Sequence, residues 1–227
     1  PGVAAVRGGC MIVIVDYGLG NLGSIANIIK KVGGSAIISK NRDDLLAATK
    51  LILPGVGSFD HGMKSLRDRG YEEVLATKVL GDRTPILGIC LGMQLFTRSS
   101  QEGTERGLGW IDAETVAFRS DPALAELKVP HIGWSSITVV RDHPCFPNRD
   151  EPRRFYFVHS YHVCCRHEEN VLATAHYGRD FTSAVTAGNL VGVQFHPEKS
   201  HRYGMALMRG FVHAFQTTLA ACQNPGA

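Results

Sequence analysis

The chain has 227 residues, of which 44% are hydrophobic, a formal net charge of +3 and a pI of ≈ 8.6. This length is enough to bury one sizeable core, and no linker or shift in composition divides the sequence. The basic excess comes without a long Lys/Arg run, so neither nucleic acid nor a membrane surface is indicated as a partner. We expect one domain over residues 11–220, with short tails at 1–10 and 221–227.

The first half alternates short apolar runs with amphipathic segments, which is typical of an α/β fold with a parallel sheet. The pattern predicts strands at 11–16, 35–39, 50–53 and 85–89, and helices near 21–32, 43–48 and 60–79. The loop Gly18–Gly23 matches G-x-G-x-x-G, but the first acidic residue near the second strand is Asp43, too late for a dinucleotide site. A tight turn between strand and helix is the better interpretation of this loop.

The second half adds further β structure and a closing helix. Strands are predicted at 109–118, 131–140, 155–164, 171–177, 182–187 and 190–195, and a helix near 202–219. Gly188-Asn189 indicates a hairpin between the last two strands. The fold class is therefore an open, mostly parallel α/β sheet flanked by helices, with additional β structure in the second half.

A cysteine lies where a buried strand should meet a helix, in Gly88-Ile89-Cys90-Leu91-Gly92. Glycines two residues before and after it allow a close strand-to-helix turn, as in the G-x-S-x-G nucleophile elbow. The N-terminus of the following helix would stabilise a thiolate. A small buried cysteine in a glycine-rich turn is the alternative.

A candidate base for this thiol lies in Gln194-Phe195-His196-Pro197-Glu198. In an extended chain His196 and Glu198 project to the same side, so the carboxylate would orient the imidazole that activates Cys90. Together they have the logic of a Cys-His-Glu triad. A capped turn at a strand end is the alternative for this motif.

These two motifs resemble those of the class I, triad-type glutamine amidotransferases. The resemblance runs from about Met11 to Phe215 and is closest to one branch, the glutaminase subunits of imidazole glycerol phosphate synthase. Four further runs carry it: Asp16-Tyr17-Gly18-Leu19-Gly20-Asn21, Leu53-Pro54-Gly55-Val56-Gly57-Ser58-Phe59, Val129-Pro130-His131-Ile132-Gly133-Trp134 and Phe157-Val158-His159-Ser160-Tyr161. The implied fold is a flavodoxin-like sheet.

The resemblance implies hydrolysis of L-glutamine to glutamate and ammonia through Cys90, His196 and Glu198. It puts the oxyanion hole at the backbone N–H groups of Val56 and Leu91, and Gly55 and Gly57 would let the Val56 peptide turn toward or away from the site. The implied substrate-binding residues are Gly55, Gly57, Gln94, Glu102, Ser160 and Tyr161.

The implied partner is the cyclase subunit of the synthase, a separate (β/α)₈ barrel that takes the ammonia within a heterodimer. The residues implied at this interface are Asn21, Trp134 and Lys199. Alternatives are a glutaminase subunit of another class I amidotransferase, a γ-glutamyl hydrolase that needs no partner, and a catalytically silent subunit. The intact triad argues against the last of these.

Neither a metal nor a cofactor is predicted. The pairs His159/His162 and Cys164-Cys165 lack zinc-site spacing. The six cysteines form no disulfide-scaffold pattern, and no apolar run reads as a membrane span or a signal peptide. We expect a reducing, cytoplasmic location.

Overall fold

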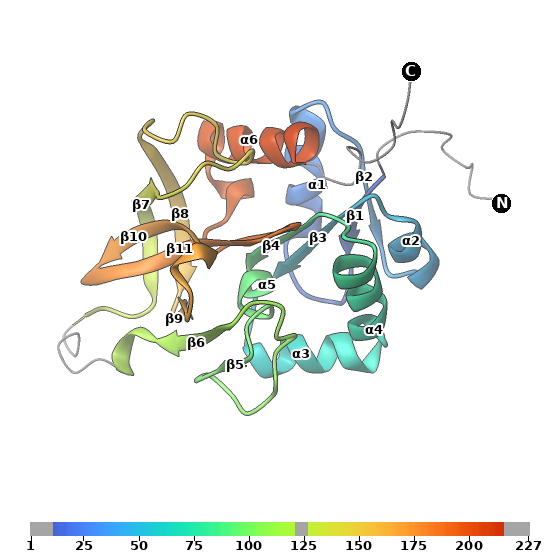
Figure 1. Cartoon of the computed structure of the whole chain (residues 1–227), viewed down its shortest axis with the longest axis horizontal. Helices are drawn as coiled ribbons and strands as arrows, with labels where there is room; N and C mark the ends of the chain where they lie inside the picture. Colours follow the sequence, from blue (N-terminus) through green and yellow to red (C-terminus); the bar gives the residue numbers. More distant parts are fainter. Residues whose placement is uncertain (1–10, 121–126, 216–227) are drawn as a thin grey trace, which may run out of the picture.

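A parallel sheet forms the centre of the protein, whose computed structural model describes residues 11–120 and 127–215 (Figure 1). Its strands run in the order β2 (Ala36–Ser39), β1 (Ile12–Val15), β3 (Lys50–Gly55), β4 (Ile86–Cys90) and β12 (Leu190–Val193), and all neighbours are parallel. The carboxyl ends of β3, β4 and β12 therefore lie at one edge, where open α/β sheets bind ligands.

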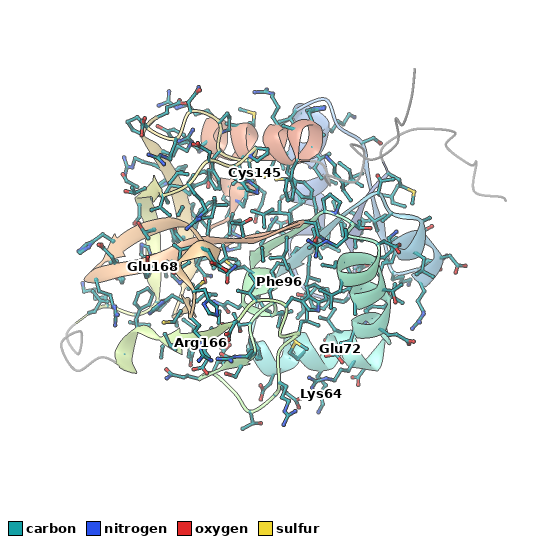
Figure 2. All side chains as sticks on the ribbon, viewed as in Figure 1. Lys64, Glu72, Phe96, Cys145, Arg166 and Glu168 are labelled. Carbon is teal, nitrogen blue, oxygen red and sulfur yellow. The ribbon has the colours of Figure 1, made fainter. Side chains whose placement is uncertain are left out.

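Helices cover both faces of this parallel sheet (Figure 1). Along β1, Ile12 and Ile14 pack in one core cluster with α1 (Leu22–Lys31) and α6 (His201–Arg209). Val13 and Val15 pack in the other cluster with α2 (Arg42–Ala47), α3 (Phe59–Asp68) and α4 (Tyr71–Ala76). Alternate side chains of β1 thus enter the two hydrophobic clusters on opposite faces of the sheet. Phe96 fills the second cluster, whereas Lys64 is exposed on α3 (Figure 2). No helix within residues 11–120 and 127–215 is long and apolar enough to cross a membrane.

The second half extends the sheet in antiparallel fashion. Next to β12 follow β11 (Arg179–Ala187), β10 (Val171–Tyr177), β7 (His131–Val139) and β8 (Arg153–His159). A branch leaves through β9 (Tyr161–Cys165), which pairs with β11 and β6 (Ala113–Ala117), and β6 pairs with β5 (Ser99–Ser100). Short turns complete the chain: η1 (Thr77–Gly81), α5 (Leu91–Gln94), η2 (Phe118–Ser120), η4 (Glu168–Asn170), η5 (Pro197–Lys199) and η6 (Gly210–Ala214). The predicted α/β architecture with added β structure is confirmed.

Several predicted boundaries are wrong for identifiable reasons. The run 155–164 is two strands, because the chain leaves β7 and joins β6 at Ser160, whose carbonyl accepts a hydrogen bond from Phe118 N at 3.2 Å. The run 109–118 becomes a strand only at Ala113, because the Trp110 and Ile111 amides bond back to the Phe96 carbonyl.

At the C-terminal end, α6 gives way to the π-helical turn η6, and Phe215 has an extended backbone. The remainder of the predicted helix 202–219, the tails and the end of the predicted domain at 220 lie outside the described residues.

Helix α5 packs so closely on β3 that a Cβ at Gly92 would overlap the Leu53 carbonyl oxygen. We expect Gly92→Ala to lower the free energy of unfolding by about 3 kcal/mol or more, because backbone must move. Gly23→Ala is the matched control: it lies inside α1 with open space around its Cβ position. That change should raise the free energy of unfolding by about 0.5–1 kcal/mol. Urea unfolding measures both, and equal stability of Gly92→Ala and wild type would contradict this account.

Candidate active site

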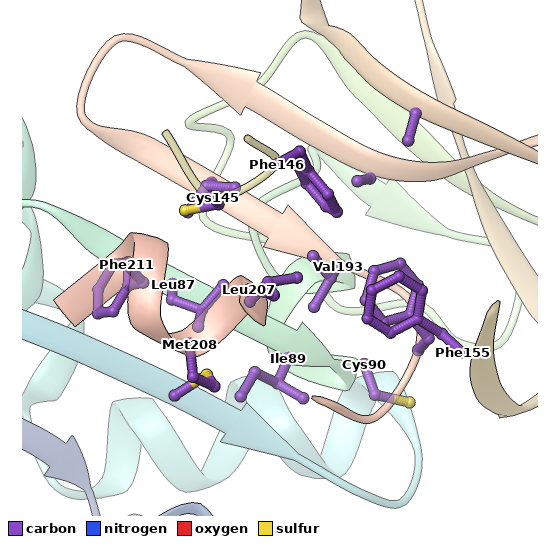
Figure 3. Packing of buried hydrophobic residues seen from close by; sticks show 14 of the residues in the cluster. Leu87, Ile89, Cys90, Cys145, Phe146, Phe155, Val193, Leu207, Met208 and Phe211 are labelled. Atoms are coloured by element: carbon purple, nitrogen blue, oxygen red, sulfur yellow. The ribbon is translucent and has the colours of Figure 1, made fainter. Parts of the chain in front are cut away.

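Cys90 lies in a strained turn between β4 and α5. Its φ of 54° is in the left-handed region, which non-glycine residues rarely adopt and which is often found at functional sites. A Cβ at Gly88 would lie 2.5 Å from the Phe96 ring, so the expected close packing around the cysteine is present. Cys90 stands at the edge of the packed core side chains (Figure 3) and is 7% exposed. The helix predicted to follow is only one turn, Leu91–Gln94.

His196 and Glu198 form a buried pair beside this cysteine. The imidazole Nδ1 lies 2.8 Å from Glu198 Oε1, and both side chains are 2% exposed. The imidazole and the carboxylate are paired as predicted, but the backbone that brings them together is not the extended chain that was expected. Only His196 is extended, and Pro197 starts the turn η5, which carries Glu198 back under the ring.

The surroundings of His196 favour its charged form. Burial lowers its pKa, but interactions with Cys90 and with Glu198 outweigh burial and raise the pKa to about 9. The other ring nitrogen, Nε2, is buried and makes no hydrogen bond to any residue that the structure describes. One nitrogen is thus held by a carboxylate, and the other remains available for proton transfer.

A cavity of about 380 Å³ opens at this edge of the sheet. Nine predicted residues line it: Val56, Gly57, Cys90, Leu91, Gln94, Glu102, Ser160, Tyr161 and His196. Pro130, Val158 and His159 complete its wall and were missed as site residues, although all three lie within the motifs quoted above. The volume suits a small-molecule ligand. In the described part of the chain, no group of three or more His, Cys, Asp and Glu is arranged to hold a metal ion.

The segment after β3 carries the predicted oxyanion donor Val56, a residue that is 45% exposed. The two flanking glycines differ. Gly55 is closely packed, since a Cβ there would lie 2.7 Å from Tyr17 Oη and 2.8 Å from Leu91 Cβ. Gly57 has a φ of 111° and open space around it. Space for a conformational change therefore exists at Gly57, after Val56, whereas Gly55, whose peptide carries the Val56 N–H, is closely packed.

Tyr17 is a further residue that sequence reasoning did not assign to the site. Its buried hydroxyl donates to the Pro54 carbonyl at 2.6 Å, immediately before Gly55 and Val56. Burial, with the nearby Cys90, raises the pKa of Tyr17, so the donor proton stays in place. The hydrogen bond joins the loop after β1 to the end of β3.

Gln94, the last residue of α5, and Glu102, which follows β5, both line the cavity. Gln94 Nε2 donates to the Tyr161 carbonyl at 3.1 Å, which leaves the amide oxygen of Gln94 as the acceptor for a ligand. Glu102 Oε2 accepts from the Phe59 amide at 2.8 Å and so caps α3, next to the Gly57 segment. One carboxylate thus borders the cavity and holds the adjoining helix.

The three predicted interface residues do not line the cavity. Asn21 accepts from the Ser24 amide at 3.4 Å and caps α1. Trp134 stacks on the His201 ring at 5.6 Å, and Lys199 Nζ lies 5.7 Å from the centre of the Tyr156 ring. Lys199 directly follows Glu198, so this aromatic and cationic cluster adjoins the site.

Comparison with known proteins identifies the family. The family model for Glutamine amidotransferase class-I matches residues 13–214. The chain belongs to this family. It is 51% identical to the imidazole glycerol phosphate synthase subunit HisH 2 of Methanococcus maripaludis and 47% identical to the protein of the same name from Pseudomonas aeruginosa. Each match covers 89% of this chain and 98% of the relative.

A solved glutamine amidotransferase structure superposes on this amidotransferase with a TM-score of 0.65 at 20% identity, covering 88% of this chain and 99% of that one. At this identity the superposition supports the fold alone. The family model and the relatives confirm the predicted class I amidotransferase and its imidazole glycerol phosphate synthase branch.

Several histidines of this amidotransferase are buried in the neutral form. Burial lowers the pKa of His131, His143 and His162 to about 4 and that of His159 to about 3. Between these values and the ordinary 6.5, the unfolded chain binds more protons than the folded one. Stability contributed by these groups is therefore present above pH 6.5 and is lost as the pH falls toward 4.

We expect the free energy of unfolding to decrease between pH 7 and pH 4.5 in urea titrations. His143→Phe should show a smaller decrease, because His143 lies outside the cavity and its Nε2 has no partner among the described residues. If the variant keeps the full pH dependence, the proposed contribution of this histidine is refuted.

Proposed function

We propose that this chain hydrolyses the side-chain amide of L-glutamine as the glutaminase subunit of an imidazole glycerol phosphate synthase. The observation that carries the proposal is the cavity in which a cysteine at a strained elbow meets a buried His-Glu pair. The names of the relatives support the same branch of the family. No cofactor takes part in this proposal.

The triad supplies the chemistry in two steps. His196 takes the thiol proton before the attack, because its surroundings favour the imidazolium. The thiolate of Cys90 then attacks the amide carbon, and the C–N bond breaks while His196 protonates the leaving ammonia. A γ-glutamyl thioester remains on Cys90. Water, deprotonated by His196, cleaves the thioester and releases glutamate. Glu198 orients the imidazole and stabilises its positive charge.

The tetrahedral intermediates of both steps require donors for the negative oxygen. We assign this role to the backbone N–H groups of Leu91 and Val56. Leu91 is the first residue of α5, where backbone N–H groups have no partner within the helix. The Val56 N–H lies on the peptide that follows Gly55, so a rotation of that peptide, accommodated by the open Gly57 on the other side of Val56, would complete or dismantle the second donor and so allow control of hydrolysis.

Glutamine would be held by its amino acid end. The Glu102 carboxylate and the Gln94 amide oxygen suit its ammonium group, and the Gly57, Ser160 and Tyr161 backbone suits its carboxylate and carbon chain. Gly55 acts indirectly, through the close packing of β3 on α5.

The proposed partner is the cyclase subunit, a (β/α)₈ barrel that receives ammonia in a heterodimer. Ammonia released into water would be protonated and lose its nucleophilicity, so a direct route to a second site is required. Asn21, Trp134 and Lys199 are assigned to this interface. Exposed apolar side chains support the assignment, because Ile132 and Trp134 on β7 are 59% and 38% exposed next to the cavity-lining Pro130.

We expect glutamate release from glutamine to appear chiefly when the chain is mixed with a cyclase barrel and the ribonucleotide ligand of that barrel. Cys90→Ala should reduce turnover by more than roughly 10³-fold. Cys164→Ala is the matched control, since Cys164 is exposed and does not line the cavity. Full activity without the barrel, or cleavage of γ-glutamyl peptides, would instead indicate another amidotransferase or a γ-glutamyl hydrolase.

The pH profile tests the role of Glu198. Because the pKa of His196 is raised to about 9, glutamine hydrolysis should decline only above about pH 9, where the proton for the leaving ammonia is lost. Glu198→Gln removes the negative charge and should move this decline to lower pH while reducing kcat by roughly 10²-fold or more. Glu114→Gln, exposed on β6, serves as the control. An unmoved alkaline decline in Glu198→Gln would contradict the assignment.

A further inference from the structure

Gln194 is a fully buried polar residue between the core side chains Val193 and Phe195. Its exposure is 0%, and its backbone N–H donates to the Ser183 carbonyl at 2.9 Å. A side-chain amide in such a place requires hydrogen-bond partners of its own, since an unpaired one costs about 1–3 kcal/mol. Those partners lie in the active site.

The amide of Gln194 bridges two residues of the site. Its Nε2 lies 3.7 Å from the sulfur of Cys90, and its Oε1 lies 3.0 Å from Gln94 Nε2. Gln194 and His196 lie two residues apart just after β12, and both side chains reach the cysteine from this strand end. Cys90 thus has two buried neighbours from one strand end, an imidazole and an amide.

The direction of these hydrogen bonds is fixed by a backbone carbonyl. The Tyr161 oxygen accepts only, so Gln94 must turn its NH₂ group toward it. The same NH₂ group then meets the oxygen of Gln194, which leaves the NH₂ group of Gln194 facing the sulfur. Cys90 therefore receives a donor, and the reverse orientation would put an oxygen against the sulfur.

A second chain of bonds holds the same carbonyl. His159 Nδ1 lies 2.8 Å from the Tyr161 oxygen and must donate to it, so the neutral ring accepts at Nε2 from His131 Nδ1, 3.0 Å away. His131 Nε2 in turn accepts from the Ser135 hydroxyl at 2.9 Å. The low pKa values of both rings keep them neutral and preserve this order. Two side-chain donors thus fix the Tyr161 carbonyl.

We propose that Gln194 is a further catalytic residue, whose N–H holds the sulfur of Cys90 in place and stabilises its negative charge. This inference rests on the proposed thiol chemistry at Cys90. A hydrogen bond to an ionised group is stronger than one to a neutral group, so the donor acts most on the thiolate. The thiolate attacks glutamine and is also the leaving group when the thioester is hydrolysed, so Gln194 serves both steps.

The hydrogen bond from Gln94 to Gln194 connects the substrate position to the nucleophile. Gln94 is assigned to glutamine, and it also aligns the amide that contacts the sulfur. A glutamine molecule bound at Gln94 is therefore connected through Gln194 to the sulfur of Cys90. Gln194 itself does not line the cavity, so its loss should affect kcat and leave KM for glutamine nearly unchanged.

The test is the rate at which iodoacetamide alkylates Cys90 in the full chain, followed on the peptide that carries this residue because the exposed Cys164 also reacts. Gln194→Met keeps a similar volume and removes the donor. We expect alkylation about 10- to 100-fold slower than in wild type, and a comparable loss of kcat in the complex with the cyclase barrel. Ser183→Ala, which removes a buried hydroxyl with no partner among the described residues, should leave both rates unchanged.

Gln194→Leu has a smaller apolar side chain and covers the case in which Gln194→Met fails to fold. It likewise offers no donor to the sulfur, so alkylation should again be slow at pH 8. Rates within twofold of wild type in either folded variant would overturn the proposal. Slow alkylation in the variants, combined with no glutamine hydrolysis by wild type, would refute the proposed function and leave the role of Gln194 standing.

Discussion

The positive φ of Cys90 is the constraint on which the rest of the site depends. A strained residue of this kind costs about 1–3 kcal/mol and persists only where the surroundings enforce it. Here α5 lies against the end of β3 at a distance that only Gly55 and Gly92 permit, and Gly88 leaves room for Phe96. Packing of the two core clusters on either side of β4 thus holds the sulfur at the carboxyl edge of the sheet.

The antiparallel half of the sheet completes the site that this elbow begins. It supplies Val158, His159 and Ser160 to the wall of the cavity, and β9 contributes the Tyr161 carbonyl. That oxygen is where both halves meet, since Gln94 reaches it from α5 and His159 reaches it from the end of β8. The buried histidines are neutral and act as oriented donors and acceptors, in contrast to His196, which a carboxylate and the cysteine hold in its charged form.

The residues that sequence reasoning found have local signatures. Cys90 is marked by its two glycines, His196 and Glu198 by their spacing, and the first-half strands by alternation with helices. Residues that act through distant contacts have no such mark: Gln194 meets a partner 100 positions away, and Tyr17 one 37 positions away. Their local pattern shows only a polar group among apolar neighbours. The strand break at Ser160 was equally hidden, because it depends on a change of pairing partner from β7 to β6.

The central claim is that the sulfur of Cys90 forms a covalent intermediate with glutamine. The most direct measurement is the mass of the protein after acid quenching during turnover of glutamine in the presence of the cyclase barrel, followed by mapping of any adduct. The account predicts a γ-glutamyl adduct on the peptide that contains Cys90, which alkali removes and which is missing in Cys90→Ala. Turnover without an adduct at any time, or an adduct on another cysteine that persists in Cys90→Ala, would contradict it.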